Sequence, residues 1–173
     1  MKQFFYTLVF LLFAGPLVGQ TQLDWSSHGQ DNYGIKAPAE WTFDNSGLMG
    51  TKFLLMSPLV DSTDDFSENI NLIVQDVSES SLSVEQFALF SLELVKKMVN
   101  DVEVVKSELE KNDGMEHYHV EYTGQQGEYK LHWVQYLYLN EGKAYILTGV
   151  ARQETSDQYV GILNKIMSTF SFK

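Results

Sequence analysis

Cysteine is absent from all 173 residues, and lysine and arginine are scarce. Without cysteine the chain can form no disulfide, thiol nucleophile, Cys-ligated zinc site or iron–sulfur cluster, and no lipid can be attached to an N-terminal cysteine. Only 12 Lys and Arg stand against 23 Asp and Glu, so the formal net charge is −11. A polyanion such as DNA, RNA or an acidic membrane would be repelled. Nucleic-acid binding is therefore excluded, and the protein is not expected to be a lipoprotein.

Catalytic signatures are also missing. The chain has no G-x-S-x-G elbow, no phosphate-cradling glycine-rich loop and no H-E-x-x-H motif. The composition is nevertheless that of a folded domain, with 44% apolar and 13% aromatic residues. We therefore expect a single globular domain that is not an enzyme.

One long apolar run occurs, and it lies at the N-terminus. Residues 4–14 (FFYTLVFLLFA) follow Lys2 and are ended by Gly15 and Pro16. This run suits the core of a signal peptide and is shorter than the roughly 20 residues that span a bilayer. It predicts a cleaved signal peptide at residues 1–19 and a mature domain at residues 20–173. The protein is then exported, to the periplasm or out of the cell, with no transmembrane segment in the mature chain.

The mature sequence predicts strands and two helices. Short apolar or β-branched stretches predict strands at residues 33–38, 52–56 and 69–77. Helical spacing follows over residues 83–100, where Ser83 and Gln86 fit a capping box. A last helix is predicted to begin at Thr155, with Gln158 at its capping-box position.

Four more strands are predicted between the helices, at residues 102–109, 115–123, 128–139 and 143–152. Turn sequences at residues 112–114, 124–127 and 140–142 separate them, which indicates hairpins and antiparallel pairing. The strand at 143–152 is apolar on both faces and should be central. The fold class is then α+β, with an antiparallel β-sheet of about six or seven strands flanked by helices.

Several stretches resemble a known family. They are YGIKAP followed by Trp41, FSENINLIVQDV at residues 66–77, SLSVEQF at the first helix, GKAYILTGVA at residues 142–151 and the closing helix before Phe172. In this order they resemble the PsbP-like superfamily, which includes PsbP, Mog-type proteins and bacterial DcrB-like exported proteins. The resemblance implies a PsbP-like sandwich and a noncatalytic accessory or partner-binding role. It assigns no functional residue.

Three of the four histidines cluster in one predicted hairpin. If residues 124–127 form its turn, His119 lies opposite His132 and Glu121 opposite Lys130. Alternation then places His117, His119, Glu121 and His132 on one face. Opposed imidazoles about 5 Å apart could share a zinc ion. The simpler interpretation is a solvated hairpin surface with cross-strand pairs.

A second candidate is the acidic loop after Pro58. It contains four carboxylates, those of Asp61, Asp64, Asp65 and Glu68. Carboxylate oxygens are the ligands that Ca²⁺ prefers, although this spacing does not match an EF-hand. Calcium binding and a solvated loop both remain open.

These observations predict a noncatalytic, exported accessory protein that binds an unknown protein or envelope partner. The alternative function is a metal- or small-ligand-binding module using the His117, His119 and His132 face. No cofactor is required by either, apart from zinc or calcium at the two candidate sites.

Overall fold

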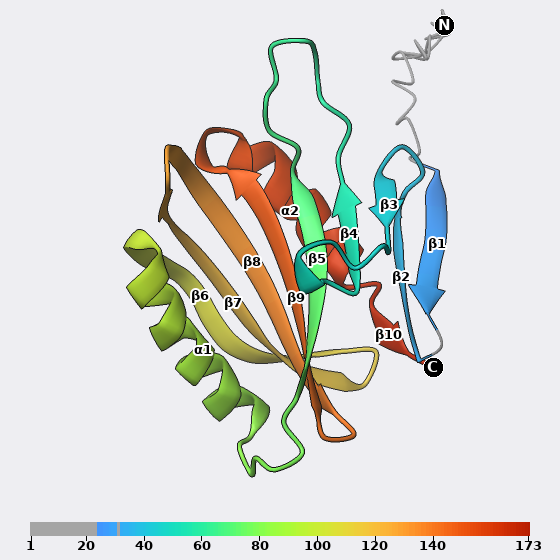
Figure 1. The fold of residues 1–173 in the computed structure, drawn as a ribbon, viewed down its shortest axis with the longest axis vertical. Helices are drawn as coiled ribbons and strands as arrows, with labels where there is room; N and C mark the ends of the chain where they lie inside the picture. The colour runs from blue at the N-terminus through green and yellow to red at the C-terminus, as the bar shows by residue number, and fades with distance from the viewer. Residues whose placement is uncertain (1–23, 31) are drawn as a thin grey trace, which may run out of the picture.

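A computed structural model describes residues 24–30 and 32–173 (Figure 1). The predicted signal peptide at residues 1–19 lies outside this range. Neither of the two α-helices described is long and apolar enough to cross a membrane. The fold is α+β, with a seven-stranded antiparallel sheet, a three-stranded sheet and an α-helix against each face of the larger sheet.

The large sheet has the strand order β3-β4-β5-β9-β8-β7-β6. Central β9 is the predicted two-sided apolar strand, and the edges are the short β3 and the long β6. The strands span Thr42–Asp44 (β3), Phe53–Met56 (β4), Asn69–Asp76 (β5), Asn100–Asn112 (β6), Met115–Gln126 (β7), Tyr129–Asn140 (β8) and Lys143–Arg152 (β9).

The small sheet has the order β1-β2-β10 and joins the two ends of the described chain. Its strands are β1 (Trp25–Gln30), β2 (Tyr33–Pro38) and β10 (Ser171–Phe172). Only β2 carries a strong apolar pattern, so the sequence predicted β2 and did not predict β1, β3 or β10. Two 3-10 turns, η1 (Leu48–Gly50) and η2 (Gln153–Thr155), complete the elements.

Helix α1 (Val84–Met98) begins with the predicted capping box, in which the Ser83 and Gln86 side chains bond reciprocally to backbone N–H groups. In helix α2 (Ser156–Met167) the predicted capping box does not form, and the Thr155 side chain makes no capping hydrogen bond. There the prediction was wrong, because the Thr155 hydroxyl bonds to the Glu68 carboxylate and the Arg152 carbonyl instead of capping the helix. A tertiary contact with Glu68 and a local contact with Arg152 thus take the place of the cap.

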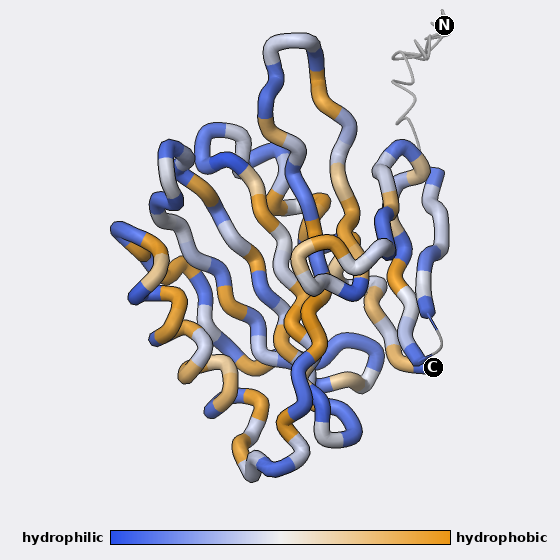
Figure 2. Tube along the Cα trace, viewed as in Figure 1, coloured by the Kyte–Doolittle hydropathy of each residue, from blue (hydrophilic) through white to orange (hydrophobic). Residues whose placement is uncertain are grey.

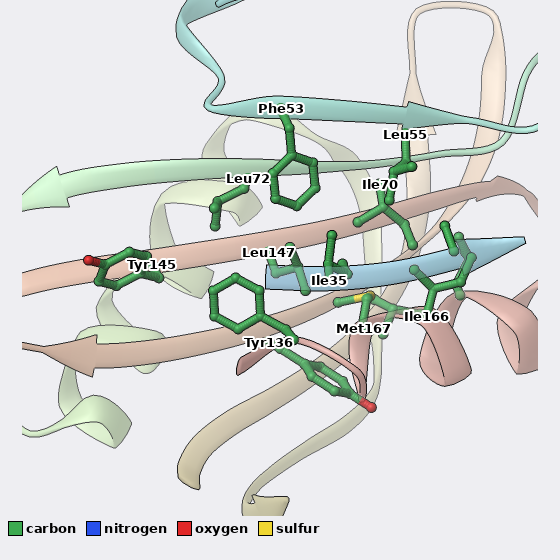
Figure 3. Close-up of a cluster of buried hydrophobic side chains, with 14 of the residues drawn as sticks. Ile35, Phe53, Leu55, Ile70, Leu72, Tyr136, Tyr145, Leu147, Ile166 and Met167 are labelled. Carbon is green, nitrogen blue, oxygen red and sulfur yellow. The ribbon is translucent and has the colours of Figure 1, made fainter. Parts of the chain in front are cut away.

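The sheet separates two hydrophobic cores. Helix α2 and β2 cover one face, where the side chains of Ile35, Phe53, Leu72, Leu147 and Ile166 pack together (Figure 3). Helix α1 packs on the other face, over β6, β7 and β8, with Phe87 and Leu92 against Tyr118, Trp133 and Leu137. The orange segments in Figure 2 follow these strands and the helix faces.

The β7–β8 hairpin turns later than predicted. Its turn falls at Gly127, whose φ of 62° favours glycine, whereas Gly124 is part of β7. A Cβ on Gly124 would lie 2.7 Å from Val99 Cγ1 and 2.9 Å from the Asn100 carbonyl oxygen. Gly124 is thus a close-approach glycine and not a turn glycine, and the predicted register was wrong.

Candidate functional site

The histidine face is buried between β6, β7, β8 and α2. In the observed register His119 lies opposite Tyr136 and His132 opposite Thr123, while Glu121 faces Val134. The predicted pairs His119–His132 and Glu121–Lys130 do not form. The same face is preserved, because the error shifts the register by an even number of residues. His117 and His119 are only 1% and 3% exposed, so the solvated hairpin surface considered above is also wrong.

Glu121 connects two of the histidines. One carboxylate oxygen lies 2.9 Å from His119 Nε2 and the other lies 3.6 Å from His132 Nε2. The His119 contact has hydrogen-bond length, although the ring N–H is poorly aligned with the oxygen. Contacts with His119 and then His132 hold the pKa of Glu121 far below its ordinary value, more strongly than burial raises it. Glu121 is therefore ionised in the folded protein.

Glu110 enters the same cluster from the edge strand β6. Its Oε2 lies 3.2 Å from His119 Nδ1 and 3.4 Å from His117 Nε2, and its Oε1 lies 2.6 Å from Lys106 Nζ. Burial raises the pKa of Glu110, but Lys106 and His119 together bring it below the ordinary value. Burial lowers the pKa of His117 and so favours its neutral ring.

His119 therefore has a carboxylate at each ring nitrogen. A neutral imidazole carries one N–H, whereas the doubly protonated ring offers a donor to both carboxylates. Glu110 contacts Nδ1 of His119 and Glu121 contacts Nε2, so the two carboxylates hold the ring from both sides. The cluster is a buried network of carboxylate and imidazole contacts.

Helix α2 covers this network and contacts it through Asn164. Asn164 Nδ2 donates to Glu121 Oε1 over 3.2 Å, and the Tyr136 hydroxyl donates to Asn164 Oδ1 over 2.9 Å. Burial raises the pKa of Tyr136 to about 12, so its hydroxyl remains a donor. The polar groups on this face are thus used to join the sheet to α2.

The sequence did not predict Lys106, Glu110 or Asn164 as members of this cluster. A signal for Glu110 was available, because the Asn112-Asp113-Gly114 turn fixes the β6–β7 register and places Glu110 opposite His117. No local signal marks Asn164. Its role depends on how α2 lies across the sheet.

This geometry bears on the two predicted metal sites. Among residues 24–30 and 32–173, no three His, Asp or Glu side chains are grouped to hold a metal ion. The four acidic residues of the loop have separate partners in the protein. Asp61 accepts from Thr63, Asp64 from the Val60 and Phe66 amides, and Glu68 from the Ser57 and Thr155 hydroxyls, while Asp65 pairs with Arg152. Metal binding at either site remains a prediction.

Arg152 marks a second feature that the sequence did not reveal. Its guanidinium lies 5.4 Å from the Phe66 ring centre and 5.1 Å from that of Tyr129, and the two rings are 5.6 Å apart. Asp65 and Glu154 pair with its nitrogens. Beside these three side chains lies a hollow of about 500 Å³, lined by Glu128, Tyr129, Lys130, Arg152, Gln153 and Glu154. We call it the Arg152 hollow.

The sheet architecture defines an α+β domain whose charged network joins elements of the fold. The PsbP family model matches residues 24–172, nearly the whole described chain. The protein belongs to the PsbP family, as the sequence motifs predicted.

Solved structures show the same fold at low identity. Cyanobacterial PsbP (CyanoP) from Synechocystis sp. PCC 6803 is 20% identical, with a TM-score of 0.61 over 94% of this chain and 99% of that one. PA94 of Pseudomonas aeruginosa, a protein of unknown function described as a putative regulator, is 12% identical, with a TM-score of 0.59 over 84% and 94%. LpqN of Mycobacterium tuberculosis, described as involved in cell envelope biogenesis, is 10% identical, with a TM-score of 0.59 over 87% and 91%. No curated protein matches by sequence.

Proposed function

We propose that this protein is a noncatalytic, exported accessory protein that binds a protein partner of the cell envelope. Membership of the PsbP family and the predicted signal peptide support this role. The description of LpqN as an envelope protein supports the same compartment. The cluster of His119, Glu110 and Glu121 favours this role over that of an enzyme, because its imidazole and carboxylates contact each other within the fold.

The Arg152 hollow is the observation that carries the proposal. An arginine packed against two adjoining aromatic rings is preorganised, and tyrosine and arginine are the residue types that dominate binding energy at protein interfaces. Tyr129 is 38% exposed, so its ring is available to a partner. Two carboxylates, Glu128 and Glu154, and two cations, Lys130 and Arg152, line the hollow, which suits a polar, mixed-charge protein surface.

Affinity capture from envelope extracts tests this proposal. The mature protein, tagged after Lys173, should recover a defined partner in a reproducible ratio. Tyr129→Ser should reduce recovery by at least tenfold, which is the loss typical of a single interface anchor. The matched control is Leu89→Ser, an exposed apolar residue on α1, which should recover the partner normally. Equal recovery with both variants, or no partner with the unmodified protein, would refute the proposal.

Metal or small-ligand binding at His117, His119 and His132 is the alternative proposal. What supports it is that His119 Nε2 and His132 Nε2 both lie beside Glu121, so a modest side-chain movement would bring two imidazoles and a carboxylate to one ion. Micromolar zinc would then raise the melting temperature of the untagged protein at pH 7.5 and much less at pH 5.5, since protonated imidazole is no ligand. The His132→Gln variant should lose the shift. An unchanged melting temperature with zinc would dismiss this alternative.

A further inference from the structure

A second hollow adjoins the Arg152 hollow, at the base of the loop between β4 and β5. This loop spans residues 57–68 and projects beyond the ends of the two strands (Figure 1). The Ser57 amide donates to the Glu68 carbonyl over 2.8 Å and closes its base. The hollow has a volume of about 260 Å³ and is lined by loop residues, by Arg152 and Glu154 and by the start of α2. We call it the Glu68 hollow.

Glu68 is the buried carboxylate of this hollow. It is only 3% exposed, whereas Glu154 and Gln158, which also line the hollow, are exposed. Glu68 Oε1 accepts from the Thr155 hydroxyl over 3.1 Å, and Oε2 accepts from the Ser57 hydroxyl over 3.3 Å. An ionised carboxylate can accept about four hydrogen bonds. Glu68 therefore retains capacity for a further donor that enters the hollow.

Glu68 has no counter-ion in the part of the chain that the structure describes. Arg152 is the only lysine or arginine that these residues contribute to the lining, and its guanidinium pairs with Asp65 and Glu154. The two groups that bond to Glu68 are neutral hydroxyls. Burial of a carboxylate without a cation is costly, and buried charges in proteins are paired as a rule. We therefore expect the cation to come from a ligand.

The charge of the Glu68 hollow favours a positively charged ligand. Four carboxylates and one guanidinium line it, those of Asp64, Asp65, Glu68, Glu154 and Arg152. Burial, and then the charges of Glu68 and Asp64, raise the pKa of Tyr159, whose side chain lines the same hollow. The Tyr159 hydroxyl thus stays neutral and supplies no charge that could balance Glu68.

The polar groups of the hollow suit an ammonium group better than a guanidinium. A guanidinium is a planar fork that binds both oxygens of a carboxylate, whereas each Glu68 oxygen already has a hydroxyl donor. A lysine ammonium is compact, carries three donors and lies at the end of a flexible four-carbon stem. We propose that the Glu68 hollow binds the ammonium group of a lysine side chain of the partner protein. Charge-assisted hydrogen bonds to Glu68 then supply its counter-ion.

This proposal rests on the proposed function and states the chemistry of its partner. Arg152 and Glu154 line both hollows, so a partner segment that contacts Tyr129 in the Arg152 hollow can place a neighbouring side chain beside Glu68. The partner should therefore carry a lysine close to the residues that contact Tyr129. With a net charge of −11, the protein also attracts a basic segment over a longer range.

Titration with a lysine probe tests the hollow in the absence of any partner. Nα-acetyl-lysine N-methylamide at millimolar concentration should shift the NMR signals of the Thr155, Gln158 and Tyr159 amides of isotope-labelled mature protein, and the shifts should saturate. The control probe, Nα,Nε-diacetyl-lysine N-methylamide, has the same stem without the charge and should give no such shifts. Equal shifts with the two probes, or none with either, overturn the proposal.

A pair of charge-matched variants tests the role of Glu68. Glu68→Gln should weaken binding of the lysine probe at least tenfold, because the amide carries no charge. Glu128→Gln removes one negative charge as well, from a residue that lines the Arg152 hollow and not the Glu68 hollow, and should bind the probe normally. Equal weakening would indicate general attraction to an acidic protein and overturn the proposal. If Glu68→Gln does not fold, the comparison of the two probes on the unmodified protein still decides.

Calcium chloride is a further probe of the same residues. The lysine probe should shift the three amide signals more than calcium does at equal concentration. Shifts with calcium and none with the lysine probe would assign the hollow to a metal ion and overturn the proposal.

Capture of the partner separates this proposal from the proposed function. Glu68→Gln should recover at least tenfold less partner, and so should the unmodified protein after the lysines of the partner are acetylated. A captured partner that needs neither Glu68 nor its own lysines overturns the ammonium site and leaves the proposed function intact. Binding of the lysine probe without a captured partner supports the ammonium site and refutes only the proposed function.

Discussion

Asn164 on α2 donates to the same Glu121 oxygen that lies 2.9 Å from His119 on β7. One carboxylate thus accepts a hydrogen bond from the helix and contacts the sheet, and the Glu121 side chain is only 12% exposed. Glu121 has three polar contacts, with His119, His132 and Asn164. Because Glu121 contacts all three groups, its removal should weaken the polar contact between α2 and the sheet.

Glu121→Gln should destabilise the folded protein by about 3 kcal/mol at pH 7, because a neutral amide replaces a buried, ionised carboxylate that contacts His119, His132 and Asn164. Urea unfolding of both proteins measures the difference. The control is Glu108→Gln, whose carboxylate is 58% exposed and pairs with Lys106 at the surface. It should cost less than about 1 kcal/mol. Equal losses would mean that burial of the network has no energetic consequence.

The stability difference between the unmodified protein and Glu121→Gln should depend on pH, because folding changes the pKa of Glu121. The folded-state pKa of Glu121 lies below its ordinary value of 4.5. A lowered pKa contributes stability that is fully present above the unfolded value and is lost as pH falls below it toward the folded value. The stability difference between the unmodified protein and Glu121→Gln should therefore shrink as pH is lowered from 6 to about 3. A difference that stays constant over this interval would contradict the ionised state of Glu121.

The histidine cluster also shows which parts of a site could be predicted. Strand alternation correctly placed His117, His119 and His132 on one face, because a side chain's face depends only on local geometry. The predicted register is wrong because it places Gly124 in the turn. Gly124 is a glycine because Val99 leaves no space for a side chain, and the sequence does not distinguish this reason from a turn. Burial of the face by α2 and the contact with Asn164 depend on contacts distant in sequence, and no local pattern reports them.

Gly124 supplies a prediction about that close approach. In Gly124→Ala the new methyl group would meet Val99 Cγ1 and the Asn100 carbonyl, and backbone cannot yield as a side-chain end can. We expect a loss of about 1 to 3 kcal/mol in the free energy of unfolding. Gly161→Ala is the matched change within α2, where nothing lies within 4 Å of the added Cβ. It should stabilise the helix by about 0.5 to 1 kcal/mol, and urea unfolding that gives both variants the same sign would refute this account.

Export can be tested through the apolar run at residues 4–14. Leu11→Arg would place a charge in the middle of the predicted signal core and should leave full-length precursor in the cytoplasm. Fractionation with immunodetection of the C-terminal tag measures it. Leu11→Val keeps the run apolar and should be processed to mature size. Mature protein outside the cytoplasm in Leu11→Arg would show that the run does not direct export.

The two phenylalanines of α1 give the sharpest test of its orientation. Phe87 is 8% exposed and packs in the core between α1 and the sheet, whereas Phe90 is 60% exposed. Phe87→Ala should cost about 3 to 5 kcal/mol, because it removes a buried ring and leaves a cavity. Phe90→Ala should change the stability by less than about 0.5 kcal/mol, since little of its ring is buried. Urea unfolding of both variants makes the comparison. A loss below about 1 kcal/mol for Phe87→Ala, or similar losses for both variants, would mean that α1 presents a different face to the sheet.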